Sequence, residues 1–340
     1  MLSIFKKKIS LNKRPFIVAE VGNNHEGNIN NAIKLIDKAS EAGADAVKFQ
    51  TYKTNLFVSK RSKSYKRLKK FELSYEYFEK LSKHAKKRKI IFFSTPLDHA
   101  SAIFLNKIQP IFKISSSDNN HKSLMELITK FEKPIFLSTG LINNAELKKI
   151  YKFLKSKIKK FKPNFSLNLL HCVSSYPVKN ENANLNSIKF LQNNYTDCNI
   201  GYSDHTVGNQ ACVSAAILGS KIIEKHFTLN KNFSNFRDHQ LSMDPKDLNE
   251  IINKIDQVIS QLGKVDIIAS KNELKNKNMY RRSIAAKNYI KKNSIVNEKD
   301  ICFLRPGIFT NQNDLKKIIG KKSFKTLNPG DFFHLKKKRF

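Results

Sequence analysis

Features that would indicate a membrane, secreted or disulfide-bonded protein are scarce in this sequence. No run of 18 apolar residues occurs, so we expect no membrane-spanning helix. The N-terminal residues Met1–Lys8 contain no apolar signal-peptide core, so we expect no secretory signal. The four cysteines, Cys172, Cys198, Cys212 and Cys302, form no CxxC pair and no zinc-binding spacing. Reduced thiols in a cytoplasmic protein are the expectation.

Acidic residues are also few. The chain has 28 Asp and Glu against 63 Lys and Arg, which gives a formal net charge of +35. Lysines are scattered through almost every helical stretch, and no RNA-recognition, zinc-finger or basic-zipper pattern is present. We therefore expect attraction of small anions, with no nucleic-acid partner. A basic nucleic-acid binder is the non-enzymatic alternative.

What the sequence does contain is a regular alternation of short β-rich runs with longer amphipathic stretches. The predicted strands are Phe16–Gly22, Ala44–Tyr52, Ile90–Pro96, Pro110–Ser117, Pro134–Gly140, Phe165–Val173, Cys198–Thr206 and Lys221–Thr228. The predicted helices are Asn30–Ala42, Tyr75–Arg88, Ser123–Phe131, Ala145–Ile158, Gln210–Leu218 and Pro245–Leu262. Eight βα units within about 250 residues predict an α/β fold, a (β/α)8 TIM barrel. A doubly wound sheet is the competing arrangement.

Polar residues lie near the C-terminal end of every predicted strand. They are Glu20, Lys48, Gln50, Ser94, Thr95, Lys113, Ser115, Ser138, Thr139, His171, Ser203, His205, Glu224 and His226. Several of them are two residues apart, and strand geometry projects such pairs to the same face. In a barrel these ends converge on one mouth, where the active sites of this fold lie.

The pattern changes after the barrel domain, for which we predict residues 1–263. A polar, lysine-rich stretch, residues 264–279, indicates a linker. Residues 280–340 predict a small, mostly β module with strand-like pieces and one short helix near Leu315–Ile319. The strand-like pieces are Ser283–Ala286, Ile301–Leu304 and Phe332–Leu335.

One long basic stretch interrupts the barrel domain. The loop Lys53–Phe71 holds eight Lys and Arg residues. It could cap the barrel mouth, but a solvated surface loop is the favoured interpretation.

The strongest local signal is a pair of histidine motifs, Gly201–Thr206 and Glu224–Thr228. His205 and His226 share the same parity at the ends of consecutive strands, so both can point into one cavity. Such a pair would suit a divalent metal with open positions for water and substrate. Two hydrogen-bonded structural histidines are the alternative.

The motifs, taken in order, resemble those of a known family. They are Ala19–Gly27, Ala46–Thr51, Phe93–Pro96, Lys113–Ser116, Leu137–Gly140, His171–Pro177 and the two histidine motifs. The chain resembles the N-acetylneuraminate (sialic acid) synthase family over nearly its whole length. Its tail, with Arg281-Arg282-Ser283 and Arg305-Pro306-Gly307, resembles the C-terminal antifreeze-like (SAF) domain of that family.

This resemblance implies that phosphoenolpyruvate condenses with an open-chain N-acetylated amino sugar, giving a nine-carbon 2-keto acid and phosphate. It implies a metal, usually manganese, on His205 and His226. The residues implied to hold phosphoenolpyruvate are Lys48, Thr95, Lys113, Ser116, Ser138 and Ser203. The residues implied to meet the sugar are Glu20, Gln50, Asp118, Tyr176 and Asp238. Arg305 would reach in from the partner of a domain-swapped homodimer, and Glu20, Lys48, Lys113, Glu224 and Arg305 are the predicted catalytic set.

The chemistry suits these residue types independently of the resemblance. Phosphoenolpyruvate brings about three negative charges, so two lysines and several hydroxyl donors would be needed to hold it. A metal would polarise the sugar aldehyde. Glu224 could activate the water that traps the cation formed at C2, or it could be a structural carboxylate paired with a lysine. His25, in the loop after the first strand, could take part directly or cap the next helix.

Three departures from the family pattern leave the sugar open. They are Ser174, Asp118 and the segment Phe236-Arg237-Asp238-His239, and all concern the amino-sugar side. N-acetylmannosamine and a 2,4-diacetamido-6-deoxy hexose are both candidates, the latter leading to a legionaminic- or pseudaminic-type acid. Another phosphoenolpyruvate-dependent synthase, making a seven- or eight-carbon keto acid, is the second enzyme hypothesis.

Overall fold

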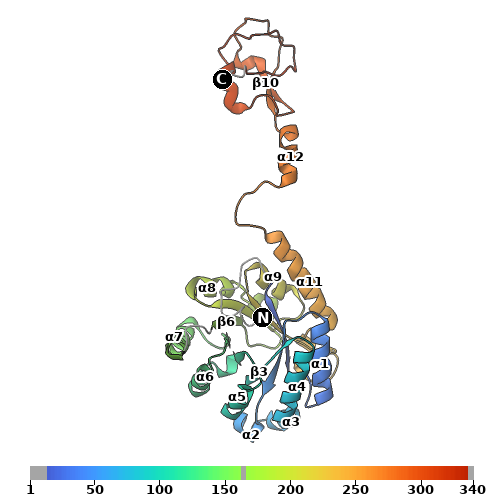
Figure 1. Cartoon of the computed structure of the whole chain (residues 1–340), viewed down its shortest axis with the longest axis vertical. Helices are drawn as coiled ribbons and strands as arrows, with labels where there is room; N and C mark the ends of the chain where they lie inside the picture. Colours follow the sequence, from blue (N-terminus) through green and yellow to red (C-terminus); the bar gives the residue numbers. More distant parts are fainter. Residues whose placement is uncertain (1–13, 162–165, 336–340) are drawn as a thin grey trace. The chain divides into compact units, whose positions relative to one another are not determined.

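Eight parallel strands form the central sheet of the first of two compact units, Met1–Gly263 (Figure 1). The computed structural model of the chain describes residues 14–161 and 166–335. The strands are β1 (Phe16–Gly22), β2 (Ala46–Thr51), β3 (Ile91–Pro96), β4 (Phe112–Ile114), β5 (Ile135–Ser138), β6 (Leu167–Cys172), β7 (Asn199–Asp204) and β8 (Ile222–His226). Their order is β3-β2-β1-β8-β7-β6-β5-β4, and the two end strands pack side by side. This is a nearly closed barrel, which confirms the predicted TIM fold and excludes the doubly wound alternative.

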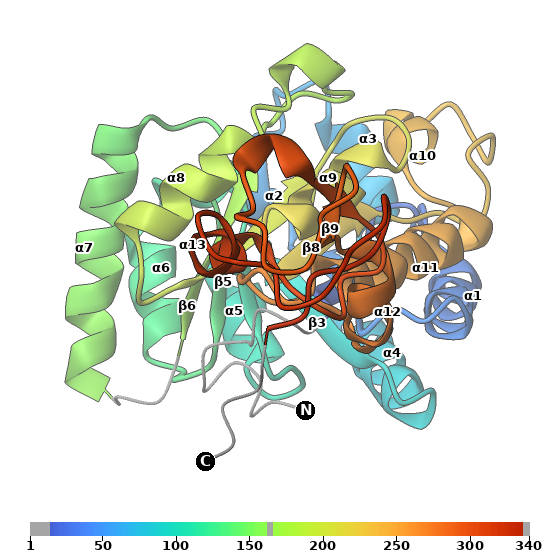
Figure 2. The same cartoon turned by 90° about the horizontal axis from the view of Figure 1, so that it is seen from above.

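Helices follow the strands and surround the barrel. They are α1 (Ile29–Glu41), α4 (Tyr75–Lys87), α5 (His99–Leu105), α6 (Lys122–Thr129), α7 (Asn144–Phe161), α8 (Asn186–Asn194), α9 (Gln210–Ile217) and α11 (Pro245–Leu262). In Figure 2, α1 lies between α4 and α11, the two helices that it contacts. The six predicted helices are present. Helices α5 and α8 were not among the predicted helices: α5 covers only seven residues, and α8 is rich in asparagine, a weak helix former. None of the helices among the described residues is long and apolar enough to span a membrane.

The interior of the barrel has an apolar floor beneath a polar layer. Phe16, Val18, Ala46, Phe93, Ile111, Phe136, Leu170 and Ile222 form the buried floor. Two residues further along each strand, the same parity gives the polar layer: Val18 precedes Glu20, Ala46 precedes Lys48, and Ile222 precedes Glu224. A second apolar layer packs the outer faces of the strands against the helices. The polar layer therefore lies at the C-terminal ends of the strands, as predicted.

The basic stretch Lys53–Phe71 is largely helical, in contrast to the predicted loop. It forms α2 (Thr54–Phe57) and α3 (Tyr65–Phe71). The Tyr52 hydroxyl donates to Leu68 O at 3.1 Å, and Glu72 accepts from both the backbone N–H and the hydroxyl of Thr54. A further short helix, α10 (Arg237–Leu241), follows β8.

The second unit, Lys264–Phe340, is small and irregular. Its antiparallel strands β9 (Ser283–Ala286) and β10 (Ile301–Leu304) and its helix α13 (Leu315–Ile318) lie where they were predicted. The piece Phe332–Leu335 was expected as a strand but makes one isolated bridge, from Phe332 to Ala285. The predicted linker is partly helical. Helix α12 (Lys271–Tyr280) begins at a capping box in which the side chains of Ser270 and Glu273 each accept from the other's backbone N–H.

Candidate active site

A cavity of about 530 Å³ opens at the C-terminal ends of the barrel strands. Its wall contains most of the predicted site residues, namely Glu20, Lys48, Gln50, Thr95, Lys113, Ser116, Ser138, Tyr176, Ser203, His205, Glu224, His226 and Asp238. These side chains come from all eight strands or from the loops that directly follow them. The cavity is therefore the mouth at which the strand ends were predicted to converge.

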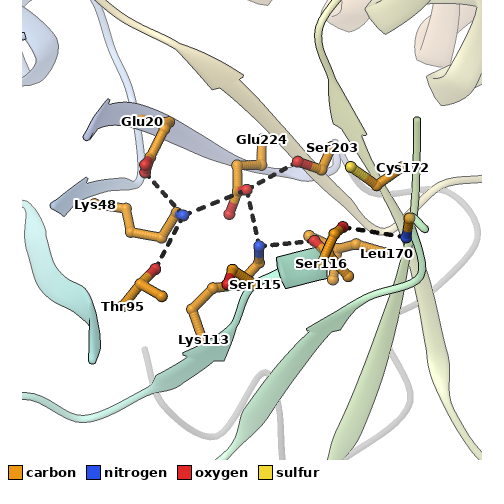
Figure 3. Close-up of polar contacts among 12 residues, drawn as sticks. Glu20, Lys48, Thr95, Lys113, Ser115, Ser116, Leu170, Cys172, Ser203 and Glu224 are labelled. Atoms are coloured by element: carbon orange, nitrogen blue, oxygen red, sulfur yellow. Dashed lines mark hydrogen bonds and ion pairs between the residues drawn. The ribbon is translucent and has the colours of Figure 1, made fainter. Parts of the chain in front are cut away.

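Two buried lysines flank one carboxylate at the base of this cavity (Figure 3). Lys48 Nζ lies 2.9 Å from Glu20 Oε2 and 3.5 Å from Glu224 Oε1, and it donates to Thr95 Oγ1 at 3.2 Å. Lys113 Nζ lies 3.2 Å from the same Glu224 oxygen. Each of the two lysines and Glu224 is no more than 4% exposed.

Hydroxyl groups complete this cluster. Lys113 Nζ donates to Ser138 Oγ at 2.7 Å, and Ser203 Oγ donates to Glu224 Oε1 at 2.9 Å. Among the described residues, Glu224 Oε2 has no hydrogen-bond partner. Two ammonium groups, three hydroxyls and two carboxylates are thus held together with little exposure to solvent. Such an arrangement suits the binding of a small anion with several oxygens.

The two carboxylates of the cluster differ in protonation. Burial raises the pKa of Glu20 to about 7, with the Lys48 ammonium opposing the shift and Glu224 adding to it. Burial also acts to raise the pKa of Glu224, but the charges of Lys113 and Lys48 outweigh it and lower that pKa to about 2. Burial lowers the pKa of Lys113. Glu224 is therefore charged near neutral pH, whereas Glu20 can gain or lose a proton there.

Two histidines form one side of the cavity. The ring centroids of His205 and His226 lie 5.4 Å apart, and His205 Nδ1 donates to Val173 O at 2.8 Å. This bond leaves His205 Nε2 as the nitrogen with a free lone pair. Burial, followed by the charge of His205, lowers the pKa of His226, and the Nδ1 atom of His226 has no partner in the described chain.

The donor set fits a divalent cation in part. Two imidazoles facing one polar cavity leave coordination positions open for water or substrate. No group of three His, Cys, Asp or Glu side chains in residues 14–161 and 166–335 is arranged as a metal site. A cation here would thus depend on two protein nitrogens and on oxygen ligands from solvent or substrate.

The loops above the histidines form a more open, aromatic wall. The ring of Tyr176 lies 4.2 Å from that of His205, between centroids, and the Arg237 guanidinium lies 4.9 Å from the centroid of Tyr176. The next residue, Asp238, has an Oδ1 atom without a hydrogen-bond partner in the described chain. Burial raises the pKa of the Asp238 carboxyl, whereas the charge of Arg237 acts to lower it. The hydrogen-bonding groups of this wall are more exposed than those of the lysine cluster.

Asp118 and His25 do not line this cavity, and Arg305 belongs to the second unit. Asp118 does not line the cavity, since its carboxylate accepts from Ser115 and Ser117 and holds their turn. Arg305 is in the second unit, where its guanidinium lies 5.9 Å from the centroid of the Tyr280 ring. His25 is buried outside the cavity wall, and its Nδ1 accepts from the Gly27 backbone N–H at 3.0 Å.

Several residues that line the cavity were not predicted. Cys172 lies on β6 two residues after the floor residue Leu170, so strand parity could have indicated it. Arg67, Leu68 and Phe71 come from α3, which means that the basic stretch Lys53–Phe71 lines the mouth instead of being only a solvated surface loop. No motif singled out these three residues.

Fold and site together define a class: a TIM-barrel enzyme whose active-site mouth holds two lysines and two histidines. The model of the NeuB family matches residues 35–266. An uncharacterised protein of Methanocaldococcus jannaschii is 42% identical, covering 90% of this chain and 89% of its own length. The N,N'-diacetyllegionaminic acid synthase of Campylobacter jejuni is 36% identical, covering 91% and 96%. The crystal structure of a sialic acid synthetase from Leptospira borgpetersenii, in complex with citrate, has a TM-score of 0.73 at 32% identity, covering 78% and 91%.

The chain belongs to the NeuB family. The predicted family is thereby confirmed, and so is the expectation of an enzyme of the sialic acid synthase class.

Proposed function

We propose that this protein condenses phosphoenolpyruvate with an open-chain N-acetylated amino sugar to form a nine-carbon 2-keto acid and phosphate. The observation that supports this best is the cluster of Lys48, Lys113 and Glu224 with its hydroxyl partners. Phosphate and carboxylate groups take up charge-assisted hydrogen bonds from two ammonium groups and the adjacent hydroxyls of Thr95, Ser138 and Ser203. Ser116, at the edge of the cluster, is a further donor.

The reaction forms one carbon–carbon bond and one carbon–oxygen bond to water, and it breaks the carbon–oxygen bond between C2 and phosphate. C3 of phosphoenolpyruvate attacks the sugar aldehyde carbon, and the aldehyde oxygen takes up a proton. Water adds to the cationic C2 and loses a proton, and phosphate then leaves together with the remaining hydroxyl proton to give the keto group. Glu20, whose pKa is raised to about 7, can exchange a proton near neutral pH, while the charged carboxylate of Glu224 stabilises the positive charge at C2.

The sugar would bind against the aromatic wall of the cavity, next to the lysine cluster. Tyr176 and Asp238 lie there, and Gln50 lines the cavity and accepts from the Asn23 side chain at 2.8 Å. The acceptor is N-acetylmannosamine or a 2,4-diacetamido-6-deoxy hexose. The legionaminic and pseudaminic acid synthases of Campylobacter jejuni, at 36% and 32% identity, support testing the diacetamido hexose, and the sialic acid synthetase of Leptospira borgpetersenii, at 32% identity, supports testing N-acetylmannosamine.

Phosphate release with a panel of aldehydes tests the proposal. The wild-type protein is expected to release phosphate from phosphoenolpyruvate with a six-carbon N-acetylated amino sugar, and mass spectrometry is expected to find a nine-carbon keto acid. Phosphate release only with four- or five-carbon aldehydes would instead favour the seven- or eight-carbon synthase. No phosphate release with any aldehyde, together with tight binding to nucleic acid, would support the non-enzymatic alternative.

We also propose a divalent metal, Mn²⁺ by family resemblance, on His205 and His226. Such an ion would polarise the aldehyde oxygen of the sugar when bound. Chelation by EDTA is expected to abolish turnover and Mn²⁺ to restore it, while His205→Ala stays inactive at ordinary Mn²⁺ concentrations. Full activity after thorough chelation would contradict the metal assignment.

The active unit in this proposal is a homodimer, in which Arg305 of an SAF-type second unit serves the barrel of the other subunit. The family resemblance of the tail supports this, together with the exposure of Arg305. We place the enzyme in the cytoplasm, in keeping with the free thiols of Cys172, Cys198, Cys212 and Cys302.

A further inference from the structure

A fully buried ion pair lies behind the histidine side of the cavity. Lys225 of β8 donates to Asp204 of β7, and these residues are opposite one another in the strand register. Lys225 is 2% exposed and Asp204 is fully buried. Neither residue lines the cavity, so the proposed chemistry does not use them.

The carboxylate of Asp204 is saturated with donors. It accepts from the Tyr202 hydroxyl at 2.9 Å, the Thr206 backbone N–H at 2.8 Å and the Thr206 hydroxyl at 3.2 Å. The Cys212 thiol lies 3.3 Å away as a further donor. Lys225 Nζ in turn donates to Thr206 O at 2.7 Å. The pair therefore holds both backbone polar groups of Thr206.

Strand parity connects this pair to the active site. Asp204 and Lys225 point outward, while Ser203 and Glu224 point into the barrel, where they are hydrogen-bonded to each other. His205 follows Asp204 directly, and His226 follows Lys225 directly. A pair that joins β7 and β8 at this register therefore fixes the distance between the two strand ends that carry the histidines.

The same pair also acts on the wall above His205. Val178 N donates to His205 O at 2.9 Å, and Val178 and Thr206 form an isolated parallel bridge. Tyr176, two residues before Val178, places its ring against that of His205. Thr206, held on both sides by Asp204 and Lys225, thus anchors the loop that brings Tyr176 to the cavity.

Stability alone does not account for a charged pair at this position. Burying two charges has a large desolvation cost, and apolar replacements of such pairs are often neutral or stabilising. What an apolar pair would not supply is the set of directed bonds to Thr206. We propose that Asp204 and Lys225 are positioning residues that orient His205, His226 and Tyr176. This inference deepens the proposed function, on which it rests.

Paired substitution separates positioning from stability. Lys225→Met alone leaves an uncompensated buried carboxylate, and we expect it to lower the melting temperature strongly. Asp204→Asn combined with Lys225→Met removes both charges, so most of the melting temperature is expected to return. We expect the double variant to bind Mn²⁺ roughly 10- to 100-fold more weakly, the loss typical when partners behind metal ligands are removed. The KM for phosphoenolpyruvate is expected to stay near the wild-type value, because Lys48 and Lys113 are untouched.

A matched control uses a pair at the other end of the barrel. Arg14 bonds to Asp45 at 2.9 Å, and Asp45 accepts from the Ile17 backbone N–H, far along β1 from the cavity. Arg14→Met with Asp45→Asn is expected to lower the melting temperature and to leave Mn²⁺ affinity unchanged. An equal loss of affinity in the control and the Asp204/Lys225 double variant would overturn the inference.

Imidazole ¹⁵N spectra without metal or substrate give a second measurement. The signals of His205 and His226, assigned with His205→Gln, are expected to shift in the Asp204/Lys225 double variant and not in the control. Unchanged signals together with wild-type Mn²⁺ affinity would show that the pair is only structural. If the wild-type protein bound no Mn²⁺ and consumed no phosphoenolpyruvate, the proposed function would fail, and unchanged signals alone would then refute the positioning role.

Discussion

Glu224 is the residue at which the charges of the active site meet. Its Oε1 atom lies within 3.5 Å of both Lys48 and Lys113, and the Ser203 hydroxyl donates to it. The lysines are buried, so neither can be lost without leaving a carboxylate less neutralised in a medium of low polarity. The same ammonium groups can bind the phosphate of phosphoenolpyruvate. We therefore expect their loss to impair the use of phosphoenolpyruvate more than the use of the sugar.

Removing either lysine is expected to impair the use of phosphoenolpyruvate specifically. Lys48→Ala and Lys113→Ala each remove a charge-assisted contact, with a loss of about 1.5–3 kcal/mol per contact. The KM for phosphoenolpyruvate should rise by roughly one to two powers of ten in steady-state assays. Asp238→Ala serves as the comparison and should change the sugar parameters instead. Equal effects of the three variants on both substrates would show that this division of the site is wrong.

The buried His25 should make the free energy of unfolding depend on pH. Burial lowers its pKa from 6.5 to about 3, and its Nδ1 must stay unprotonated to accept from the Gly27 N–H. Between pH 6.5 and 3 the unfolded chain therefore binds a proton at His25 that the folded chain does not. The free energy of unfolding should fall as the pH decreases through this window, by up to about 1.4 kcal/mol per pH unit from this residue.

The variant His25→Asn isolates that contribution. An asparagine oxygen can accept from the Gly27 N–H without titrating, so the variant should lose less stability than wild type between pH 6.5 and 4.5. Urea unfolding at both pH values measures the difference. Parallel pH dependences in the two proteins would show that His25 titrates normally in the folded state.

At the scale of elements, α11 shows how local sequence starts a helix that the barrel then uses. Asp244 caps it, with Asp247 reciprocating in a capping box, and Pro245 occupies the first turn. Apolar residues spaced three or four apart, among them Leu248 and Ile255, are buried beneath it. These signals explain why the observed helix, Pro245–Leu262, has the predicted ends.

Asp244→Ala should weaken the fold without changing the chemistry. Loss of an N-cap carboxylate costs about 1 kcal/mol, and chemical denaturation should report that decrease in the free energy of unfolding. The exposed Lys246, in the first turn of α11, provides the control, because Lys246→Ala is expected to change stability by less than about 0.5 kcal/mol. Because α11 does not line the cavity, kcat should remain at the wild-type value. A drop in kcat without a drop in stability would contradict this separation.

The helices of the segment Lys53–Phe71 were not predicted from the local sequence. Its lysines and arginines give it the composition of a solvated loop, yet Phe71 is buried and Arg67 faces the cavity. Its position depends on Glu72, which bonds to Thr54, and on Tyr52, which holds Leu68 O. These contacts join residues 16 to 18 positions apart, beyond the reach of a helical or strand period.

At the scale of the whole molecule, the proposed exchange of second units makes a prediction about mixed dimers. Arg305→Ala and Lys48→Ala are each expected to release little phosphate when phosphoenolpyruvate is supplied near the wild-type KM. Mixing them should restore part of the activity, because a mixed dimer contains one barrel with intact Lys48 that meets an intact Arg305 from the other chain. Phosphate release after verified subunit exchange is the measurement.

The control for this experiment mixes two barrel variants. Lys48→Ala with Lys113→Ala leaves every barrel defective, so no activity should return whatever the arrangement of the second units. If mixing Arg305→Ala with Lys48→Ala were equally ineffective, Arg305 would act in the barrel of its own chain or outside catalysis.

The sequence by itself determined the order of the eight strands, six of the helices around the barrel and the family, because periodicity and motifs are properties of neighbouring residues. Strand parity also indicated which side of each strand carries the site, from Glu20 on β1 to His226 on β8. Only the tertiary structure decided that Glu224 bonds to both lysines, that Asp118 turns away to Ser115, and that Arg67 reaches the mouth. These outcomes depend on distances between segments far apart in the chain, which are set by closure of the barrel and not by any local pattern. The buried ion pair of Asp204 and Lys225 was likewise decided by the tertiary structure, because the two residues meet only through the register of β7 and β8.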